Sequence, residues 1–324
     1  MNRIQRLFMG TGSNMGIIVT AWREALLAGA QEVTPDHLLT ALAVSGGPAA
    51  ELLARHGVTV ATLREATHTR DVNDLASLGI DASTLGRPQR RSIAQLWSTT
   101  PKLEMSPLTE QLVKSLQDAD GEMEALRTLI DHPTTGAAEA LRGCGVDIEA
   151  LRADLDADTS AIAHGIRHVA PIPGLLDGLD ESTVAVTRFV PVDIERLATV
   201  ARSPDLVVQW FYGGPDVHLD EQHRILREQR GAAIELRKVV DERTGDRLAI
   251  AWQEHWSGGK HHDPRGYYLH LLMQPAGMGT RITFTRGFRG LGRGGCVIAR
   301  LSAELSRLSV NPTIQNLVQV AEDE

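Results

Sequence analysis

The fold of the first half of this chain is decided by Gly47-Pro48-Ala49-Ala50-Glu51-Leu52-Leu53-Ala54-Arg55-His56-Gly57-Val58, which leads into Leu63-Arg64. Nearly the same residues return in Gly136-Ala137-Ala138-Glu139-Ala140-Leu141-Arg142-Gly143-Cys144-Gly145-Val146, which leads into Leu151-Arg152. The separation is a constant 88 positions, from Ala49 to Ala137 and from Arg64 to Arg152. An internal repeat of this kind indicates one helical unit used twice. A repeated helical unit without catalytic residues points to binding.

Length and charge limit the classes of protein to consider. A chain of 324 residues has room for two domains of about 150 residues each. The net charge of −8 argues against a nucleic-acid partner. No apolar run approaches the roughly 20 residues that span a bilayer, and the first ten residues lack the apolar core of a secretory signal. Cys144 and Cys296 lie too far apart for a metal or redox motif. We therefore expect a cytoplasmic protein without metal, cofactor, membrane or nucleic-acid contact.

Aromatic residues divide the chain, because only Phe8, Trp22 and Trp97 precede residue 183. Residues 1–157 are rich in Leu, Ala, Arg and Glu, whereas residues 183–288 alternate with the period of a β-strand. Pro171-Ile172-Pro173-Gly174 between them is typical of a linker. The sequence thus predicts an all-α double repeat at 1–157, a linker at 158–182, an α+β antiparallel-sheet domain at 183–310 and a C-terminal tail at 311–324.

The helices of the first copy have recognisable boundaries. One helix is expected over 14–27, and Thr34-Pro35-Asp36-His37 reads as the start of a second, with Thr34 as N-cap and Pro35 at the first helical position. A third helix is expected over 49–56, closed by Gly57, and Thr59 caps a fourth that runs to about Thr67. In the second copy about one helix's worth of the first-helix and loop region is expected to be missing or compressed, since Thr109 lies nearer to Glu124 than Thr11 does to Asp36.

This pattern resembles the Clp N-terminal (Clp R) repeat found at the front of the Clp unfoldase chaperones ClpA and ClpC. The family's Gly-Thr-Glu-His-Ile-Leu-Leu start, Gly-rich turn with Val-Ala-Ala, and Leu-Gly-Val stand here as Thr34–Leu39, Gly46–Ala50 and His56-Gly57-Val58. The resemblance implies a module that docks peptides and adaptors. It also implies partners among Clp ATPase and protease components or their substrates.

The resemblance places candidate binding residues at Asp36, His37 and, through the offset of 88, Glu124. In the ClpC branch the matching glutamates contribute to a site for phosphorylated arginine. A carboxylate can grip a guanidinium through paired charge-assisted hydrogen bonds. The alternative for Asp36 is a first-turn acid that offsets the helix dipole, and for His37 a packed, hydrogen-bonded helix residue. No Gly-x-x-x-x-Gly-Lys-Ser/Thr phosphate loop is present, so a docking domain without an ATPase is expected.

The second half is expected to be a sheet with few helices. Strands are predicted over 183–190 and near 217–226, 233–240, 247–256, 267–273 and 281–288, with short helices at 193–201 and 203–211 and a last helix at 295–308. This order resembles the START-like, polyketide-cyclase-like (SRPBCC) superfamily. The resemblance implies a helix-grip fold in which a curved sheet wraps the last helix and can leave an apolar cavity.

Alternation predicts which side chains of this sheet share a face. Trp252, Glu254 and Trp256 fall on one face of their strand, as Arg286 does on its own. Charged groups among aromatic ones must pair or bind something polar. Two readings stay open, a structural ion pair or cavity mouth and a ligand or catalytic role. An apolar small ligand is a possible partner of this domain.

Two further motifs are better explained as loops than as a dinucleotide-binding or a metal-binding site. Gly290-Leu291-Gly292-Arg293-Gly294-Gly295 matches a dinucleotide fingerprint but lacks a second strand and acid after it. Lys260-His261-His262-Asp263 lacks a third metal ligand at helical or strand spacing.

The function that the sequence favours is non-catalytic docking, as an accessory or a decoy of the Clp protease system. The alternatives are a START-like binding protein or enzyme for an apolar small molecule, tethered by the repeat, and a protective scaffold without a ligand.

Overall fold

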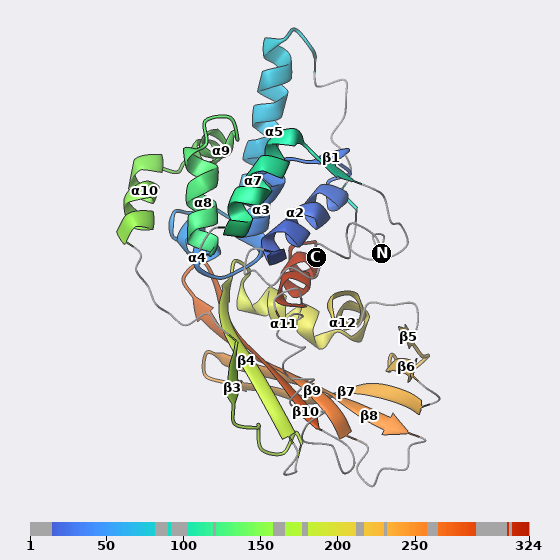
Figure 1. Cartoon of the computed structure of the whole chain (residues 1–324). Coiled ribbons are helices and arrows are strands. Elements are labelled where there is room, and N and C mark those ends of the chain that lie inside the picture. The colour runs from blue at the N-terminus through green and yellow to red at the C-terminus, as the bar shows by residue number, and fades with distance from the viewer. Residues whose placement is uncertain are drawn as a thin grey trace. The chain divides into compact units, whose positions relative to one another are not determined.

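The computed structural model describes residues 15–81, 90–91, 103–118, 121–157, 166–176, 181–211, 217–229, 232–257, 265–289, 310 and 313–323. The chain divides into two compact units, Met1–Ile162 and Ala163–Glu324, which are described separately (Figure 1).

The first unit is a helical double repeat. The first copy comprises α2 (Met15–Leu27), β1 (Glu32–Val33), α3 (Pro35–Val44), α4 (Pro48–Arg55) and α5 (Val60–Ser77). The second comprises β2 (Glu104–Met105), α7 (Pro107–Asp118), α8 (Glu122–Asp131), α9 (Ala137–Gly143) and α10 (Ile148–Ala157). The two short strands pair in parallel. In the part of the unit that the structure describes, each copy contributes four helices.

The repeated residues form the same helix ending in both copies. Gly57 and Gly145 both adopt a positive φ, 79° and 84°, which favours glycine. The amide of the valine after each glycine donates to a leucine carbonyl, Val58 to Leu53 at 3.0 Å and Val146 to Leu141 at 3.1 Å. This is the Schellman motif, in which two orphan carbonyls of the helix end are satisfied. The internal repeat is therefore a repeat of structure.

The second copy keeps a first helix, α7, in the region that was expected to be missing or compressed. Helix α7 stands before α8 as α2 stands before α3. What is shorter is the connection, which runs over residues 119–121 in the second copy and over 28–34 in the first. Helix α5 is longer than expected, because it continues past Thr67 to Ser77 and projects beyond the other helices of the unit (Figure 1).

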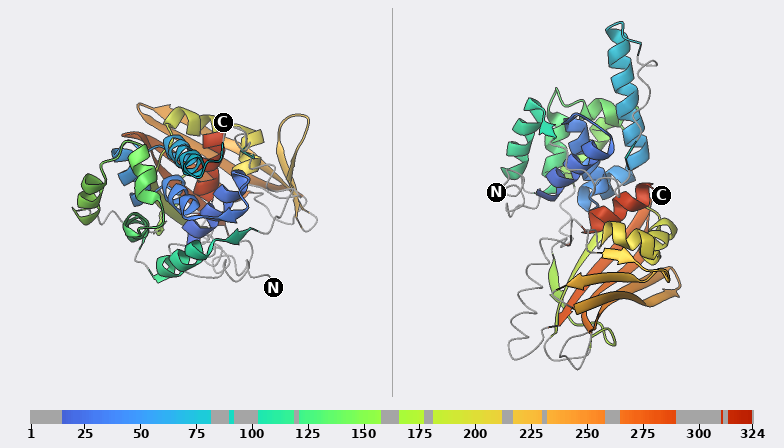
Figure 2. Two further views of the ribbon diagram at one scale, coloured as in Figure 1. Left: turned by 90° about the horizontal axis from the view of Figure 1, so that it is seen from above. Right: turned by 90° about the vertical axis from the view of Figure 1, so that its right-hand side faces the viewer.

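The second unit is built on one antiparallel sheet in the order β3-β4-β10-β9-β8-β7-β6-β5. Its strands are β3 (Arg167–Val169), β4 (Glu181–Val190), β5 (Val217–Leu219), β6 (Ile225–Gln229), β7 (Ala232–Thr244), β8 (Arg247–Ser257), β9 (Arg265–Ala276) and β10 (Gly279–Arg289). Helices α11 (Ile194–Arg202) and α12 (Pro204–Trp210) follow β4 and lie on one face of the sheet (Figure 2). This architecture is consistent with the expected helix-grip domain.

The sheet is covered on both faces. On one face Trp252 is buried and its indole N–H donates to the carbonyl of Ala201 in α11 at 2.8 Å. On the other face Leu175 and Leu176 are buried with Ala251 and Tyr268. Residues 167–169 and 175–176, which the sequence assigns to a linker, therefore belong to the sheet and its cover.

Other expectations differ in detail. The strand expected near 217–226 is the hairpin of β5 and β6. Strand β7 runs on past the expected end at Val240 to Thr244, so that only Gly245 and Asp246 form the turn before β8. Residues 313–323 are helical where a tail is expected, with Ile314, Leu317, Val318 and Ala321 buried along one stripe. The motifs at 260–263 and 290–295 and the helix expected at 295–308 lie outside the described residues.

Candidate functional site

Asp36 lies in the first turn of α3, and its carboxylate is already engaged by a guanidinium of the same chain. Arg70 of α5 donates from Nη1 to Oδ1 at 2.9 Å and from Nη2 to Oδ2 at 2.7 Å. The same Nη1 donates to the carbonyl of Gly136 at 3.0 Å. The side chains are 20% and 16% exposed, so the pair is shielded from water. The predicted binding role of Asp36 is not tested by this arrangement, but a ligand guanidinium would have to displace Arg70.

His37 forms part of the N-terminal cap of α3. Its Nδ1 accepts from the backbone N–H of Thr34 at 3.1 Å and lies 2.8 Å from the Thr34 hydroxyl oxygen. This is the reciprocal half of a capping box, with histidine at the position usually held by Glu or Gln. Burial lowers the pKa of His37, although nearby Asp36, Glu24 and Asp71 partly oppose the shift.

Acid is expected to weaken this cap. The lowered pKa means that the folded state prefers neutral His37, so its contribution to stability is complete above about pH 6.5 and is lost as pH falls below that value. Protonated Nδ1 cannot accept from Thr34, so the loss should approach the value of a cap, about 1 kcal/mol. The His37→Gln variant, which can still reach back without titrating, should lose less stability between pH 7.5 and 5 in thermal melts. Parallel pH dependence in both proteins would contradict this role.

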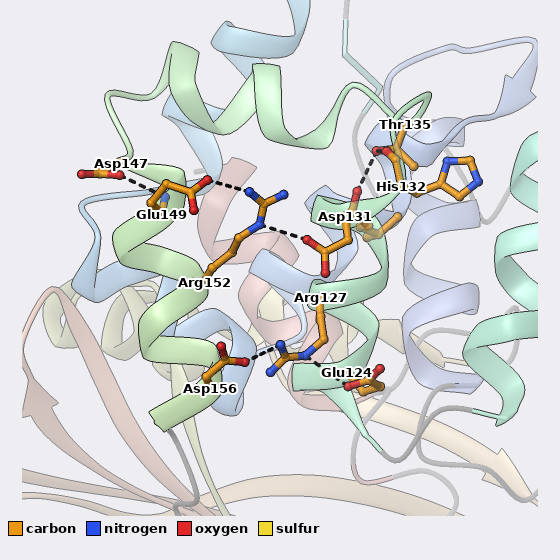
Figure 3. Close-up of polar contacts among 10 residues, drawn as sticks. Glu124, Arg127, Asp131, His132, Thr135, Asp147, Glu149, Arg152 and Asp156 are labelled. Atoms are coloured by element: carbon orange, nitrogen blue, oxygen red, sulfur yellow. Dashed lines mark hydrogen bonds and ion pairs between the residues drawn. The ribbon is translucent and has the colours of Figure 1, made fainter.

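Glu124, the counterpart of Asp36 in the second copy, lies at the surface. Its side chain is 51% exposed and is 3.4 Å from Nε of Arg127 on the same helix, α8. Arg127 also donates to Asp156 of α10 at 2.5 Å, and Arg152 of α10 bonds Asp131 of α8 at 3.0 Å (Figure 3). Two arginines thus join α8 and α10 across an exposed, predominantly acidic surface.

The first unit contains a buried ion cluster that was not predicted from the sequence. Glu24 of α2 is 2% exposed, and both of its oxygens accept from Arg64 at 3.0 and 3.2 Å and from Arg90 at 3.2 Å. Arg64 is the repeat counterpart of Arg152, which instead bonds exposed carboxylates. The same residue at the same repeat position therefore stabilises the interior of one copy and the surface of the other.

The sheet residues singled out from sequence have protein partners. Trp252 is held by α11, and the indole N–H of Trp256 donates to Glu254 at 3.2 Å. Arg286 is buried, donates to the Thr313 hydroxyl at 2.6 Å and lies 5.2 and 5.7 Å from the ring centroids of Phe284 and Phe211.

An aromatic group surrounds this arginine. Tyr267 stacks on Phe211 at 5.9 Å and tilts against Phe288 at 5.0 Å. Burial raises the pKa of the Tyr267 hydroxyl, and the charge of Arg286 only partly opposes the shift. Cross-strand pairing places Tyr267 opposite both Glu254 and Phe288, so the face predicted from alternation is the one that carries these groups.

Two features of the described residues bear on metal binding and on membrane insertion. Within these ranges no group of three or more His, Cys, Asp or Glu side chains is placed to hold a metal ion. Among the helices described, none is by itself long and apolar enough to cross a membrane, whereas the bent pair of α3 and α4 meets that criterion by length and composition alone.

The comparison with protein families decides the identity of the helical part. Residues 11–128 match the model of the Clp repeat (R) N-terminal domain. This part of the chain thus carries a match to the Clp repeat over a little more than a third of the 324 residues. The match spans the first copy and reaches into α8 of the second, and the structural repeat continues to Ala157. The Clp repeat predicted from the residues around Thr34 and Gly57 is thereby confirmed.

Comparisons of the whole chain add structural likenesses at low identity. No curated protein matches the sequence. Protein MLL2253 from Mesorhizobium loti is 17% identical, with 44% of this chain and 97% of that chain covered and a TM-score of 0.30. Hypothetical protein jhp0584 from Helicobacter pylori is 17% identical, with 48% and 95% covered and a TM-score of 0.33. A protein from Arthrobacter aurescens is 14% identical, with 49% and 92% covered and a TM-score of 0.31.

Proposed function

We propose that this chain is a docking protein of the Clp type, which binds a Clp component or a Clp-directed peptide through its Clp repeat unit. The observation that carries the proposal is the family match over residues 11–128. The 324 residues contain no Gly-x-x-x-x-Gly-Lys-Ser/Thr phosphate loop, which a Clp motor requires. The unit would therefore bind ligands of the Clp protease system without an ATPase motor within these residues. It would act either as an accessory that delivers ligands or as a decoy that sequesters them.

Glu124 is the more accessible of the two predicted carboxylates. It is half exposed and lies beside one arginine at 3.4 Å, whereas Asp36 is clamped by both nitrogens of a guanidinium fork. Charged groups at the rim of an interface change association rate and specificity more than they change total affinity. A cationic segment of a partner is thus expected to meet the second copy first.

The experiment is a binding titration with purified full-length protein. A Clp ATPase and an arginine-containing peptide that it recognises are titrated in turn against wild type, Glu124→Ala and Glu139→Ala. Glu139 is a matched control, because it is 57% exposed and also lies 3.4 Å from an arginine three residues on. Loss of a half-exposed charge should weaken binding by roughly twofold to fivefold in the first variant, mainly through slower association, and leave the second unchanged. Absence of binding by wild type to both ligands, or hydrolysis of ATP by the chain itself, would contradict the proposal.

A second function is favoured by the aromatic group around Arg286. A guanidinium flanked by Phe211 and Phe284 beside Tyr267 could recognise an apolar molecule with an anionic or aromatic end. We propose the binding of such a molecule as a second function of this chain, carried by the sheet unit. Binding of a fluorescent aromatic carboxylate that is weakened by Phe288→Ala would support it, and unaltered binding would count against it.

A further inference from the structure

One face of α5 joins the two copies of the repeat. Burial raises the pKa of the Cys144 thiol just after α9, and hydrogen bonding to Thr62 of α5 partly opposes this shift. One turn further along, the Cβ of Ala66 would lie 3.1 Å from a Cβ at Gly143, so the two helices approach closely. The next residue on this face is Arg70, since residues four apart lie above one another on a helix. Helix α5 of the first copy thus packs along α9 of the second.

Arg70 lies at the end of the contact between α5 and α9, and its guanidinium donates to four oxygen acceptors. Two belong to Asp36 of α3, at 2.9 and 2.7 Å, and one is the carbonyl of Gly136 at the start of α9, at 3.0 Å. The fourth is Oδ1 of Asp71 at 3.0 Å. Parallel N–H···O bonds from both guanidinium nitrogens to one carboxylate are the geometry that arginine provides and lysine cannot. Hydrogen bonding to Asp36 raises the pKa of Arg70 despite its partial burial.

Gly136 gives room for this cation. Its φ is +69°, and a Cβ at this position would overlap the guanidinium of Arg70. The residue is therefore restricted twice, once by backbone conformation and once by the neighbouring side chain. The space around the cation is formed by three segments: the start of α3, the start of α9 and α5 itself.

We infer that the Asp36 carboxylate, the Gly136 carbonyl and Asp71 form a guanidinium receptor that Arg70 fills from within the chain, and that filling it couples the two copies of the Clp repeat. Because Arg70 is tethered to the receptor, it competes with any free guanidinium at a high effective concentration. The receptor is thus closed to outside ligands while Arg70 is in place. The inference does not rest on the docking function, since it follows from contacts within the chain and needs no outside partner.

The test empties the receptor and refills it with a small cation. Arg70→Ala in the full-length protein should lower the melting temperature of the first unit by about 5–10 °C. A domain of this size loses about 2–4 °C for each kcal/mol of lost unfolding free energy. It should also speed hydrogen exchange in peptides covering α3 and α9. Methylguanidinium should reverse both effects in a saturable way, with a Kd on the order of 1–10 mM. Methylammonium, which carries the charge without the fork, is the control.

The outcome is decided by a second variant. Recovery in Arg70→Ala that is absent from Asp36→Asn/Arg70→Ala supports the receptor. Equal recovery in both variants, or none in either, overturns it. Should Arg70→Ala not fold, Arg70→Gln retains much of the side-chain volume and serves in its place. Wild-type protein should show no response to methylguanidinium at the same concentrations, because its receptor is filled.

Discussion

Replacing Gly287 with alanine is expected to destabilise the sheet unit by about 2–3 kcal/mol, a large loss for a single methyl group. Gly287 pairs with Tyr268 across β10 and β9, and a Cβ at this position would overlap the tyrosine ring. Tyr268 is fully buried, and its hydroxyl accepts from the backbone of Ile172 at 3.2 Å. Displacing the ring should therefore release the segment that covers this face of the sheet. Urea denaturation, with hydrogen exchange of residues 166–176, measures both effects.

A double-mutant cycle separates this effect from a general cost of altering glycine. In a Tyr268→Leu background the ring no longer lies over position 287, so Gly287→Ala should cost well under half of its effect in wild type. Gly277→Asn, in a turn at φ +57° with open space around it, is a control that should cost little. Additive free energies in the cycle would contradict the proposed contact.

Removing the carboxylate of Asp36 is expected to destabilise the first unit by about 2–3 kcal/mol. The change leaves Arg70 shielded from water without its two strongest acceptors, and loss of one partner of a partly buried pair costs more than the pair contributes. A residue that only offset the helix dipole would contribute about 0.3–1 kcal/mol. Thermal and urea denaturation of full-length Asp36→Ala distinguishes these two cases.

The matched control is the same change in the other copy. Glu124→Ala removes an exposed carboxylate whose neighbour, Arg127, keeps its bond to Asp156. Exposed ion pairs contribute little, so its transition should coincide with that of wild type. Equal destabilisation by the two substitutions would show that the copies carry equivalent carboxylates after all.

Local chemistry explains which elements are predictable from sequence. The helix endings at Gly57 and Gly145 depend on residues within one turn, and the strands β4, β8 and β10 depend on alternation, so each is apparent without the fold. Helix α7 is missed because its sequence shares too little with α2 for an alignment at the offset of 88. The end of α5 is missed because residues past Thr67 are mostly exposed and show no apolar stripe.

The same distinction applies to the segment at 166–176 and to the candidate site. Pro171, Pro173 and Gly174 suggest a linker, yet Leu175 and Leu176 find apolar partners on β8 and β9, which lie much later in the chain. Asp36 is predictable as a first-turn acid of α3. Its partner Arg70 is not, because 34 positions of chain separate the two and only the packing of α5 brings them together. Contacts between segments that lie far apart in the chain could therefore not be predicted from the sequence.

The most direct test of the docking function is the rate at which a reconstituted Clp ATPase and protease degrade a model substrate in the presence of the full-length chain. The account predicts a saturable change in rate, an increase if the chain delivers ligands and a decrease if it sequesters them. A variant with Glu124 and Asp131, which lie about two turns apart on α8, both replaced by alanine should shift the half-maximal concentration upward, whereas Glu139→Ala should not. A degradation rate that is unchanged at the highest attainable concentration of wild-type chain would contradict the proposed docking function.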